Sequence, residues 1–483
     1  MLLSVVAIFS SCNGNTGDGV STTVTTVPQG GEIVDDPNKI YEDLPTGNYD
    51  GYEMNFLNAD SNFIQTIVPE DTIDTVDAAI FARNSFVKEK LNVNFKETNQ
   101  SPNNVKTTMS NLTSSNDFEY DAVFNTVYRQ TPLAQSGTYI SVEELDPSLN
   151  LNKPWWFKDV MDSIAVDGNS FEIFGDIHLY YYESIWGMVF NQQDFIDNKQ
   201  TFPYDLVRSG NWTLAEMEKI MKATYQKPGY DHYAIVGHKD LISAMMVASG
   251  FELVSQDDVD VLKVFDDEEY FVDTYTKIMN VFFTSNGPSK MNIIIADYDS
   301  DAYASGIFQQ IQEETFQKWF INGKGTFMGG TIGDIRMVRE SEFAYGIIPL
   351  PKIHEEQDQY VSMVVNYAYS LGIPATTPHL EQTCVILENL AAYSYKLVKH
   401  EYYDIVVQGR TVRDSDSIEM LDIIFGHTDL GIAKFEIDML FQFGLMNQIR
   451  KDMSDSVTEI MVNIDGVMGS VETNIEAAID GYR

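Results

Sequence analysis

The densest cluster of side chains that could do chemistry is Tyr180-Tyr181-Tyr182-Glu183-Ser184-Ile185-Trp186. Aromatic rings can stack on the apolar C–H faces of a sugar, while carboxylates and short polar side chains bond its hydroxyls. The chain holds 26 Tyr, 28 Phe and 5 Trp, so rings are abundant enough for such recognition. The cluster therefore predicts a saccharide-binding segment, and packing in a hydrophobic core is the alternative interpretation.

Motifs for catalysis and metal binding are missing or incomplete. The sequence has no H-E-x-x-H, no Walker A motif and no G-x-S-x-G turn. Asp297-Tyr298-Asp299-Ser300-Asp301 has the alternating oxygens of a calcium loop, but Ala302 and Phe308 stand where an EF-hand needs Gly and Glu. A glycosidase-like pair could always be chosen from 72 acidic residues, and sequence does not give the separation that catalysis requires. We therefore expect no catalytic residue, no metal and no cofactor.

Cys12 indicates how the chain is located. It follows an apolar stretch, Leu2 to Phe9, and the small pair Ser10-Ser11, a pattern typical of a secretory signal. This predicts cleavage before Cys12 and acylation of the new N-terminus; a frayed hydrophobic terminus with a chance cysteine is the alternative. The stretch is far shorter than the ~20 residues that span a membrane. The second cysteine, Cys384, lies in an apolar helical pattern and is expected to be a buried, inert thiol.

Composition and charge exclude some partners. The formal charge of −41 argues against nucleic-acid binding and against adsorption to anionic lipid. With 44% hydrophobic and 21% charged residues, the 483-residue chain is typical of a soluble globular protein with room for more than one domain. Residues 13–45 are polar and rich in Gly and Pro, so they are expected to form a flexible tether.

The elements that must position these residues alternate between strands and helices. In the first part we expect strands at 52–57, 91–95 and 120–124, with helices at 75–90 and 105–112 between them. This order predicts an α/β lobe with a parallel core. Farther on we expect strands at 184–191, 344–350 and 364–373. Helices are expected from a Thr213–Glu216 capping box to about 225 and at 381–395, and a helix or a helix pair is expected at 457–482.

Six segments, in the same order along the chain, resemble extracellular solute-binding proteins of type 1, the ABC-importer receptors whose better-known members bind sugars. They are Ala79–Val87, Leu145-Asp146 with Lys153-Pro154-Trp155-Trp156, Met188–Asn191 with Asp194-Phe195, Tyr204–Thr213, Tyr345–Lys352 with Gln357-Asp358 and Tyr360, and Tyr402-Tyr403 with Arg413-Asp414, Ser417 and Met420–Ile424. The chain departs from the pattern at Gln192, where most relatives have Lys.

The resemblance implies a two-lobed α/β periplasmic-binding-protein-like fold of type II, with parallel-core sheets flanked by helices and a hinge between the lobes. It divides the chain into a lipoprotein signal (1–12), a tether (13–45), lobe 1 (46–178), lobe 2 (179–350), a return to lobe 1 (351–400), and lobe 2 with C-terminal helices (401–483). The crossings are expected near 176–186, near 349–366 and after about 399.

The resemblance also implies that ligand contacts come from loops at the strand ends and from the crossings. The residues expected there by position are Asp60, Ser61, Asn62, Asn125, Thr126, Tyr128, Glu183, Trp186, Met328, Gly329, Gly330, Thr331, Asn366 and Tyr367. Glycines in this set would let a ligand approach the backbone closely.

Taken together, these features predict a non-enzymatic, monomeric, lipid-anchored receptor on the outer side of the membrane that captures a small solute, a sugar or oligosaccharide, by hinge closure. Its partners would be a pair of ABC permease subunits, and it would meet the membrane only through its anchor. Two alternatives stay open at this point: a secreted carbohydrate-active enzyme, and a surface glycan-binding protein without a transporter.

Overall fold

The computed structural model describes residues 43–59, 66–68, 74–165, 169–224, 232–238, 240–251, 254–256, 262–264, 267–283, 293–296, 315–365, 367–407, 415–430 and 462. Contacts divide the chain into two units, Met1–Leu44 and Pro45–Arg483, and the second contains all the helices and strands named below. Cys12, the tether up to residue 42, the acidic loop 297–301 and the expected helix 457–482 (apart from Val462) lie outside the described residues.

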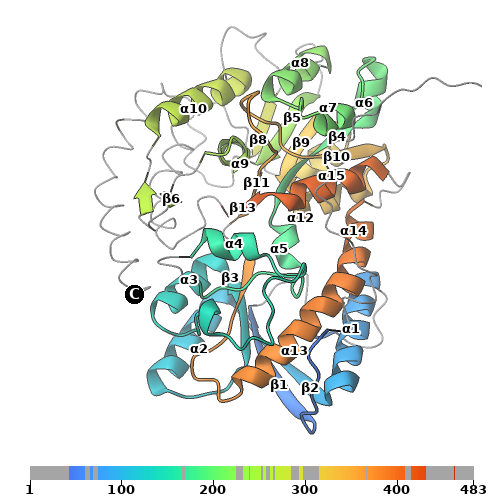
Figure 1. The fold of residues 1–483 in the computed structure, drawn as a ribbon. Coiled ribbons are helices and arrows are strands. Elements are labelled where there is room, and N and C mark those ends of the chain that lie inside the picture. The colour runs from blue at the N-terminus through green and yellow to red at the C-terminus, as the bar shows by residue number, and fades with distance from the viewer. Residues whose placement is uncertain are drawn as a thin grey trace, which may run out of the picture. The chain divides into compact units, whose positions relative to one another are not determined.

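The first sheet has four strands in the order β12-β3-β1-β2, and three of them are parallel (Figure 1). Only β12 runs antiparallel, beside β3. The elements are β1 (Tyr52–Ala59), α1 (Thr75–Leu91), β2 (Val93–Gln100), α2 (Pro102–Ser115), β3 (Ala122–Thr126), α3 (Val127–Gln135), a 3-10 turn (Val142–Glu144), α4 (Lys158–Ser163) and, much later, β12 (Tyr369–Gly372) and α13 (Leu380–Tyr393). The parallel core expected from the strand and helix alternation is confirmed.

The second sheet has five strands in the order β10-β4-β9-β5-β8. Its elements are β4 (Trp186–Asn191), α6 (Gln192–Asp197), α7 (Tyr204–Arg208), α8 (Leu214–Thr224), β5 (Tyr233–His238), α9 (Asp240–Ala248), α10 (Glu268–Phe283), β8 (Ile293–Ala296), α11 (Phe316–Ile321), β9 (Gly325–Thr331), α12 (Ile332–Met337), a 3-10 turn (Val338–Glu340), β10 (Tyr345–Ile348) and α15 (Ser415–Gly426). Two small pairs complete the described strands: β6 (Val254–Gln256) with β7 (Leu262–Val264), and β11 (Ser362–Met363) with β13 (Thr428–Asp429).

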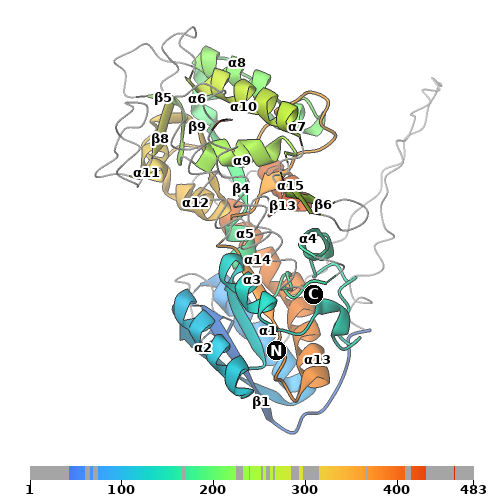
Figure 2. The ribbon, with the colours of Figure 1, turned by 90° about the vertical axis from the view of Figure 1, so that its left-hand side faces the viewer.

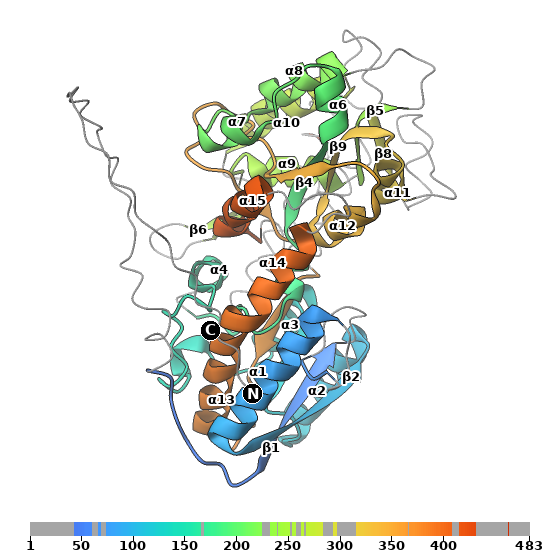
Figure 3. The same cartoon turned by 90° about the vertical axis from the view of Figure 1, so that its right-hand side faces the viewer.

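Both sheets follow one plan. In the first sheet β1 lies between β2 and β3, all three are parallel, and β12, which enters from the other sheet, runs antiparallel beside β3. In the second sheet β5 lies between β8 and β9, all three are parallel, and β4, which enters from the other sheet, runs antiparallel beside β9. Helices cover both faces: α1 and α13 lie on one side of the first sheet, with α2 and α3 on the other (Figure 3). In the second sheet α8, α9 and α10 lie opposite α11 and α12 (Figure 2). Because the plan repeats, the carboxyl ends of β1 and β3 in the first sheet correspond to those of β5 and β9 in the second.

Three segments join the two sheets. The first holds α5 (Tyr180–Glu183), between a bridge from Ile173 to Leu371 of β12 and the start of β4. The second follows Val364, which bridges to Ile185, and ends at β12. The expected single strand over 364–373 is therefore wrong, because the chain changes sheets within it. The third is a helical run in which α13 continues through a π-helical segment (Ser394–Val398) into α14 (Lys399–Val407).

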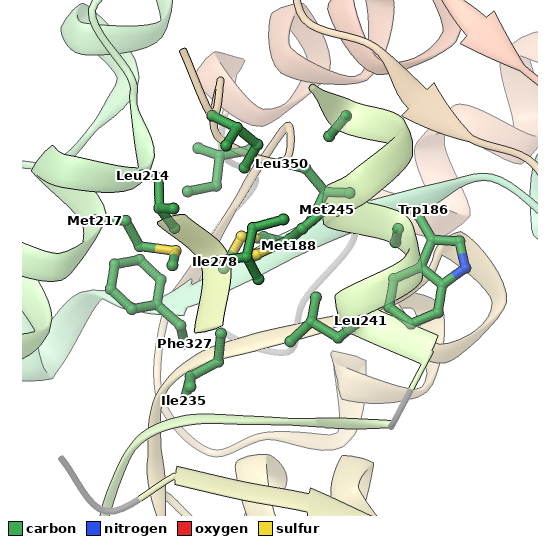
Figure 4. Packing of buried hydrophobic residues seen from close by; sticks show 14 of the residues in the cluster. Trp186, Met188, Leu214, Met217, Ile235, Leu241, Met245, Ile278, Phe327 and Leu350 are labelled. Atoms are coloured by element: carbon green, nitrogen blue, oxygen red, sulfur yellow. The ribbon is translucent and has the colours of Figure 1, made fainter. Parts of the chain in front are cut away.

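A large apolar cluster packs α8, α9 and α10 on the second sheet (Figure 4). Met188, Ile235 and Phe327 rise from the strands against Met217 and Leu241 of the helices. Ile353, Tyr360, Met363 and Val365 belong to the same cluster. The return to lobe 1 was expected at residue 351, but residues 351–365 still pack on the second sheet because their apolar side chains complete this core.

The remaining expectations concern single residues and the membrane. Cys384 is fully buried, and burial raises the pKa of its thiol to about 12, so it is inert as expected. Half of the expected capping box is present, since the Thr213 hydroxyl accepts from the Glu216 N–H at 3.3 Å. Among the described residues, no helix combines the length and the apolar character needed to cross a bilayer.

Candidate ligand-binding site

An arginine stands at the carboxyl end of the first sheet. β3 ends at Thr126, and α3 begins at the next residue. The Thr126 side chain does not cap a backbone N–H of the helix; its hydroxyl instead accepts from Arg129 Nη1 at 3.4 Å. Arg129 Nε donates to Asn103 Oδ1 at 2.7 Å, and its guanidinium lies 3.9 Å from the centre of the Tyr128 ring. Burial lowers the pKa of Arg129.

An aspartate takes the equivalent place in the second sheet. β9 ends at Thr331, and α12 follows with a closed capping box. The Thr331 hydroxyl accepts from the Asp334 N–H at 3.3 Å, while Asp334 Oδ2 accepts from the Thr331 N–H at 2.9 Å. Asp334 Oδ1 accepts from Gln317 Nε2 at 2.6 Å. Both carboxylate oxygens are thus engaged within the protein, although the negative charge remains at this strand end.

A row of aromatic rings leads from the first sheet to the first crossing. Phe124 of β3 lies 5.0 Å from His178, His178 lies 5.1 Å from Tyr369, and Tyr369 lies 4.6 Å from Tyr180, measured between ring centres. Burial and the charge of Arg83 lower the pKa of His178 to about 3, so the imidazole is neutral. Because these rings pack on one another, they fix Tyr180 and Tyr369 beside the carboxyl end of β3.

Tyr367 is an exposed aromatic residue near the second sheet. It leaves 42% of its surface exposed. Burial nevertheless raises the pKa of its hydroxyl, and the nearby charges of Asp334 and Asp240 and the hydroxyl of Tyr180 raise it further. Asp334 follows β9 and Asp240 begins α9 after β5, so Tyr367 lies near the carboxyl ends of the second sheet. Sites in open α/β sheets lie at such ends.

Glu183 holds the crossings together. Its Oε1 accepts from the Tyr402 hydroxyl at 2.7 Å and from Arg336 Nε at 3.2 Å. It is 6% exposed, and burial raises its pKa while Arg336 and Tyr402 oppose that shift. A second link runs from Asp176, which accepts from the Tyr182 hydroxyl at 2.5 Å and lies 3.7 Å from Lys399 Nζ. The expected ligand contact at Glu183 stays a prediction, since its observed bonds join α5 to α12 and α14.

Side chains of the protein occupy the space beside the glycine-rich strand β9. Met328, Gly329 and Gly330 are buried in the middle of the second sheet. A side chain at Gly329 would meet Leu241 Cδ1 at 2.4 Å, so helix α9 occupies the space that was expected to admit a ligand. Close approach at this glycine serves helix packing on the sheet.

The other expected residues divide into three groups. Asn125 is buried, and its amide bonds the carbonyl of Pro102 and the N–H of Thr126. Trp186 is buried at the start of β4, and its Nε1–H has no hydrogen-bond partner within the described part of the chain (Figure 4). Asp60, Ser61, Asn62 and Asn366 lie outside the described residues.

Three residues at the strand ends were missed: Arg129, Asp240 and Asp334. A cation three places after Thr126 was the available signal for the first, and Thr331 with Asp334 could have been recognised as a capping pair. Tyr180 belongs to the aromatic cluster but was not singled out as a contact. Among the described residues, no group of His, Cys, Asp and Glu is arranged to hold a metal ion.

Comparison with known proteins supports the fold through structure alone. No protein-family model and no curated protein sequence matches the chain. Solved structures do match. A cyclo/maltodextrin-binding protein complexed with maltotetraose has a TM-score of 0.59 at 12% identity, over 88% of this chain and 97% of that one. An ABC substrate-binding protein from Listeria monocytogenes in complex with cycloalternan has a TM-score of 0.55 at 12% identity, over 88% and 100%.

A third structure, UgpB from Mycobacterium tuberculosis in complex with glycerophosphocholine, has a TM-score of 0.56 at 12% identity, over 87% of this chain and 99% of that one. Two of these ligands are oligosaccharides and the third is a phosphodiester, so the shared fold does not decide what is bound. Together with the two sheets and their crossings, these likenesses confirm the expected architecture: the chain has the two-lobed α/β fold of solute-binding proteins.

Proposed function

We propose that this protein is the solute-binding receptor of an ABC importer and that it captures a saccharide at the carboxyl ends of its two sheets. The observation that carries the proposal is the exposed ring of Tyr367 near the carboxyl ends of the second sheet, where the charges of Asp240 and Asp334 act on its hydroxyl. An aromatic face beside acceptor oxygens suits a sugar, which is apolar on its faces and rich in hydroxyl donors at its edges.

The crossings support capture by closure of the two halves. Glu183 and Asp176 join the first crossing to the third through Tyr402 and Lys399. Hinges of this kind are a few residues at element ends that absorb a change in backbone angles. In the proposal, ligand binding favours the closed arrangement, and the closed form is what the permease subunits recognise.

The finer parts of the proposal concern location and partners. Acylated Cys12 and the polar tract 13–45 would tether a monomer to the outer side of the membrane beside two permease subunits. Mass spectrometry of the membrane fraction should find a lipid-modified Cys12, and a Cys12→Ala variant should appear in the soluble fraction. A wild-type chain that is soluble and unmodified would remove the anchor from the proposal.

Calorimetry with purified protein tests the ligand class. A panel of neutral and acidic mono- and oligosaccharides, peptides and polyols is titrated into wild type, Tyr367→Ala and the control Phe86→Ala. Phe86 is a 52% exposed aromatic residue on α1, which packs against Tyr393. At least one saccharide should bind wild type and the control and lose affinity with Tyr367→Ala. Binding of peptides with no response to saccharides would contradict the proposal.

The same preparation separates the two alternatives. A carbohydrate-active enzyme would release products from the saccharide that it binds, and a receptor would return it unchanged. A glycan-binding protein without a transporter would bind but would not stimulate ATP hydrolysis by a reconstituted permease complex encoded beside it. The two named binding proteins with this fold agree with binding rather than catalysis.

A further inference from the structure

Arg129 stands where a helix disfavours a cation. It is the third residue of α3, which has nine residues, Val127–Gln135. The first turn of a helix carries partial positive charge from its unpaired N–H groups, so acidic side chains stabilise it and basic ones do not. Asp334 fills the matching position of α12 and caps it. Sequence positions that break a local rule often serve function.

The protein supplies little to compensate this charge. Within the described part of the chain, Arg129 bonds only neutral oxygens, those of Asn103 and Thr126. A guanidinium that loses water without gaining a carboxylate is destabilised, which agrees with the lowered pKa of Arg129. In a chain with 72 acidic residues, such a cation is conspicuous.

A second cation, Arg83, is buried beside the same aromatic row, and the nearby charge of Glu97 offsets part of its charge. Arg83 of α1 donates to the Thr66 carbonyl at 2.7 Å, to the Ser394 hydroxyl at 3.0 Å and to the Ile177 carbonyl at 3.2 Å, all neutral acceptors. Its charge lowers the pKa of His178, the ring that stacks on Tyr369. Tyr369 in turn raises the pKa of Arg129, so the two cations flank the same aromatic row.

The guanidinium of Arg129 is also oriented for recognition. Its centre lies 3.9 Å from the centre of the Tyr128 ring, and its Nε and Nη1 donate to Asn103 and Thr126. Its Nη2 has no protein acceptor among the described residues. An arginine held in this way suits oxyanions, to which it can donate two parallel hydrogen bonds.

We propose that the bound saccharide is acidic and that its anionic group, a carboxylate or a phosphate, accepts hydrogen bonds from Arg129 over the carboxyl end of β3. The proposal rests on the saccharide-binding function above and adds the ligand's charge and direction. Asp240 and Asp334 make the opposite side negative, so the anionic end faces the first sheet and neutral hydroxyls face Tyr367.

Calorimetry on the full chain at low ionic strength tests this with charge-matched probes. Trigalacturonate is compared with its fully methyl-esterified form, which keeps the sugar but removes the charge, and galactose 1-phosphate is compared with galactose. In wild type the charged member of at least one pair should bind at least about tenfold more tightly, which corresponds to ~1.4 kcal/mol. The first pair reports a carboxylate ligand, and the second reports a phosphate.

Variants locate the effect. Arg129→Gln should remove the preference for the charged probe, and Arg129→Lys should keep only part of it, because lysine lacks the planar fork. Arg339→Gln removes the same charge at an exposed position and should behave as wild type. Circular dichroism and the thermal midpoint verify folding of each variant, and the wild-type comparison of charged and neutral probes holds even if a variant does not fold.

The outcomes separate this inference from the proposed function. Equal affinity for charged and neutral probes, or a preference that survives in Arg129→Gln, overturns the acidic ligand. If neutral saccharides bind in the same panel, saccharide capture still stands. If no saccharide binds, both proposals fail.

Discussion

The carboxyl ends of β3 and β9 are built alike and charged oppositely. Both strands end in a threonine, and both continue into a helix whose third residue is charged: Arg129 after β3 and Asp334 after β9. The aspartate closes a capping box with Thr331, whereas Thr126 gives its hydroxyl to the arginine. One backbone plan, used twice, therefore carries opposite charges at its two strand ends.

This difference teaches where stability and function separate. The second strand end satisfies its own N–H groups, so it needs nothing from a ligand. The first has no side-chain cap and carries a cation in the first turn of its helix, which an anion would offset. A solute held between two such ends would be bound in one direction only.

Removal of the Glu183 side chain should have the largest effect, because the two halves share this clamp. Glu183→Ala leaves Arg336 without its carboxylate and Tyr402 without its acceptor in a buried setting. The free energy of unfolding should fall by about 3–5 kcal/mol in urea denaturation. Glu419→Ala, which removes a partner of the exposed Arg208, is the control and should cost less than about 1 kcal/mol. Equal losses would mean that the crossing is not a clamp.

The pH dependence of stability should reveal a buried acid in the first half, since the core over the second sheet is apolar. Glu172 accepts from Thr131 and Ser370, and burial raises its pKa to about 7. The unfolded value is about 4.3, so the folded state holds the proton more tightly. Glu172 thus stabilises the fold at low pH, and this contribution is lost as the pH rises through about 7.

Urea denaturation between about pH 5 and about pH 8 measures this contribution, which should be roughly 2–3 kcal/mol. Glu172→Gln should reduce the loss of stability with rising pH. Asp176, whose pKa burial raises to about 6, acts in the same direction, so part of the slope should remain. An unchanged slope in Glu172→Gln would place the proton elsewhere.

Tyr367 should distinguish the carboxyl ends of the second sheet from the rest of the surface. Tyr367→Ala removes an exposed ring and should lower saccharide affinity about tenfold, while the free energy of unfolding changes little. Tyr367→Phe keeps the stacking face and should retain most of the affinity if the ring matters more than the hydroxyl. A Phe variant as weak as the Ala variant would instead assign the contact to the hydroxyl.

The smallest effect is the most specific to the contrast of the two strand ends. Arg129→Asp gives α3 the pairing that α12 already has, and a new capping box with Thr126 should raise the free energy of unfolding by about 0.5–1 kcal/mol. The same change should abolish the preference for an anionic ligand. A variant that loses stability would show that Arg129 stabilises the strand end and that its role is structural rather than ligand-binding.

The fold could be predicted from sequence because its signals are local. Alternation and apolar runs locate β1, β2 and β3, and caps such as Asp74 and Ser101 mark where helices begin. The two-lobed architecture was predicted from the order of the six segments that resemble a known family, because hydrophobic periodicity alone does not indicate it. The boundary at 351 was placed too early because the apolar residues 353–365 carry no sign of which sheet they cover.

The site was less predictable because it depends on neighbours distant in sequence. Gly329 suggests access to the backbone until Leu241 is seen above it. The sequence gives no sign that Glu183 bonds Arg336 and Tyr402, some 150 and 220 residues away in the chain. Arg129 was overlooked because a single basic residue in a short helix is unremarkable until its partners are known to be neutral.

The π-helical segment at Ser394–Val398 sets the angular phase of the third crossing. Upstream of it α13 faces α1, and downstream α14 presents Lys399 and Tyr402 to Asp176 and Glu183. Each residue in a helix advances about 100° around the axis. Deleting one residue here would rotate both side chains away from their partners while leaving every helix intact. The number of residues in this helical run therefore determines whether Lys399 and Tyr402 reach the first crossing, and an insertion or deletion should be tolerated least at this point.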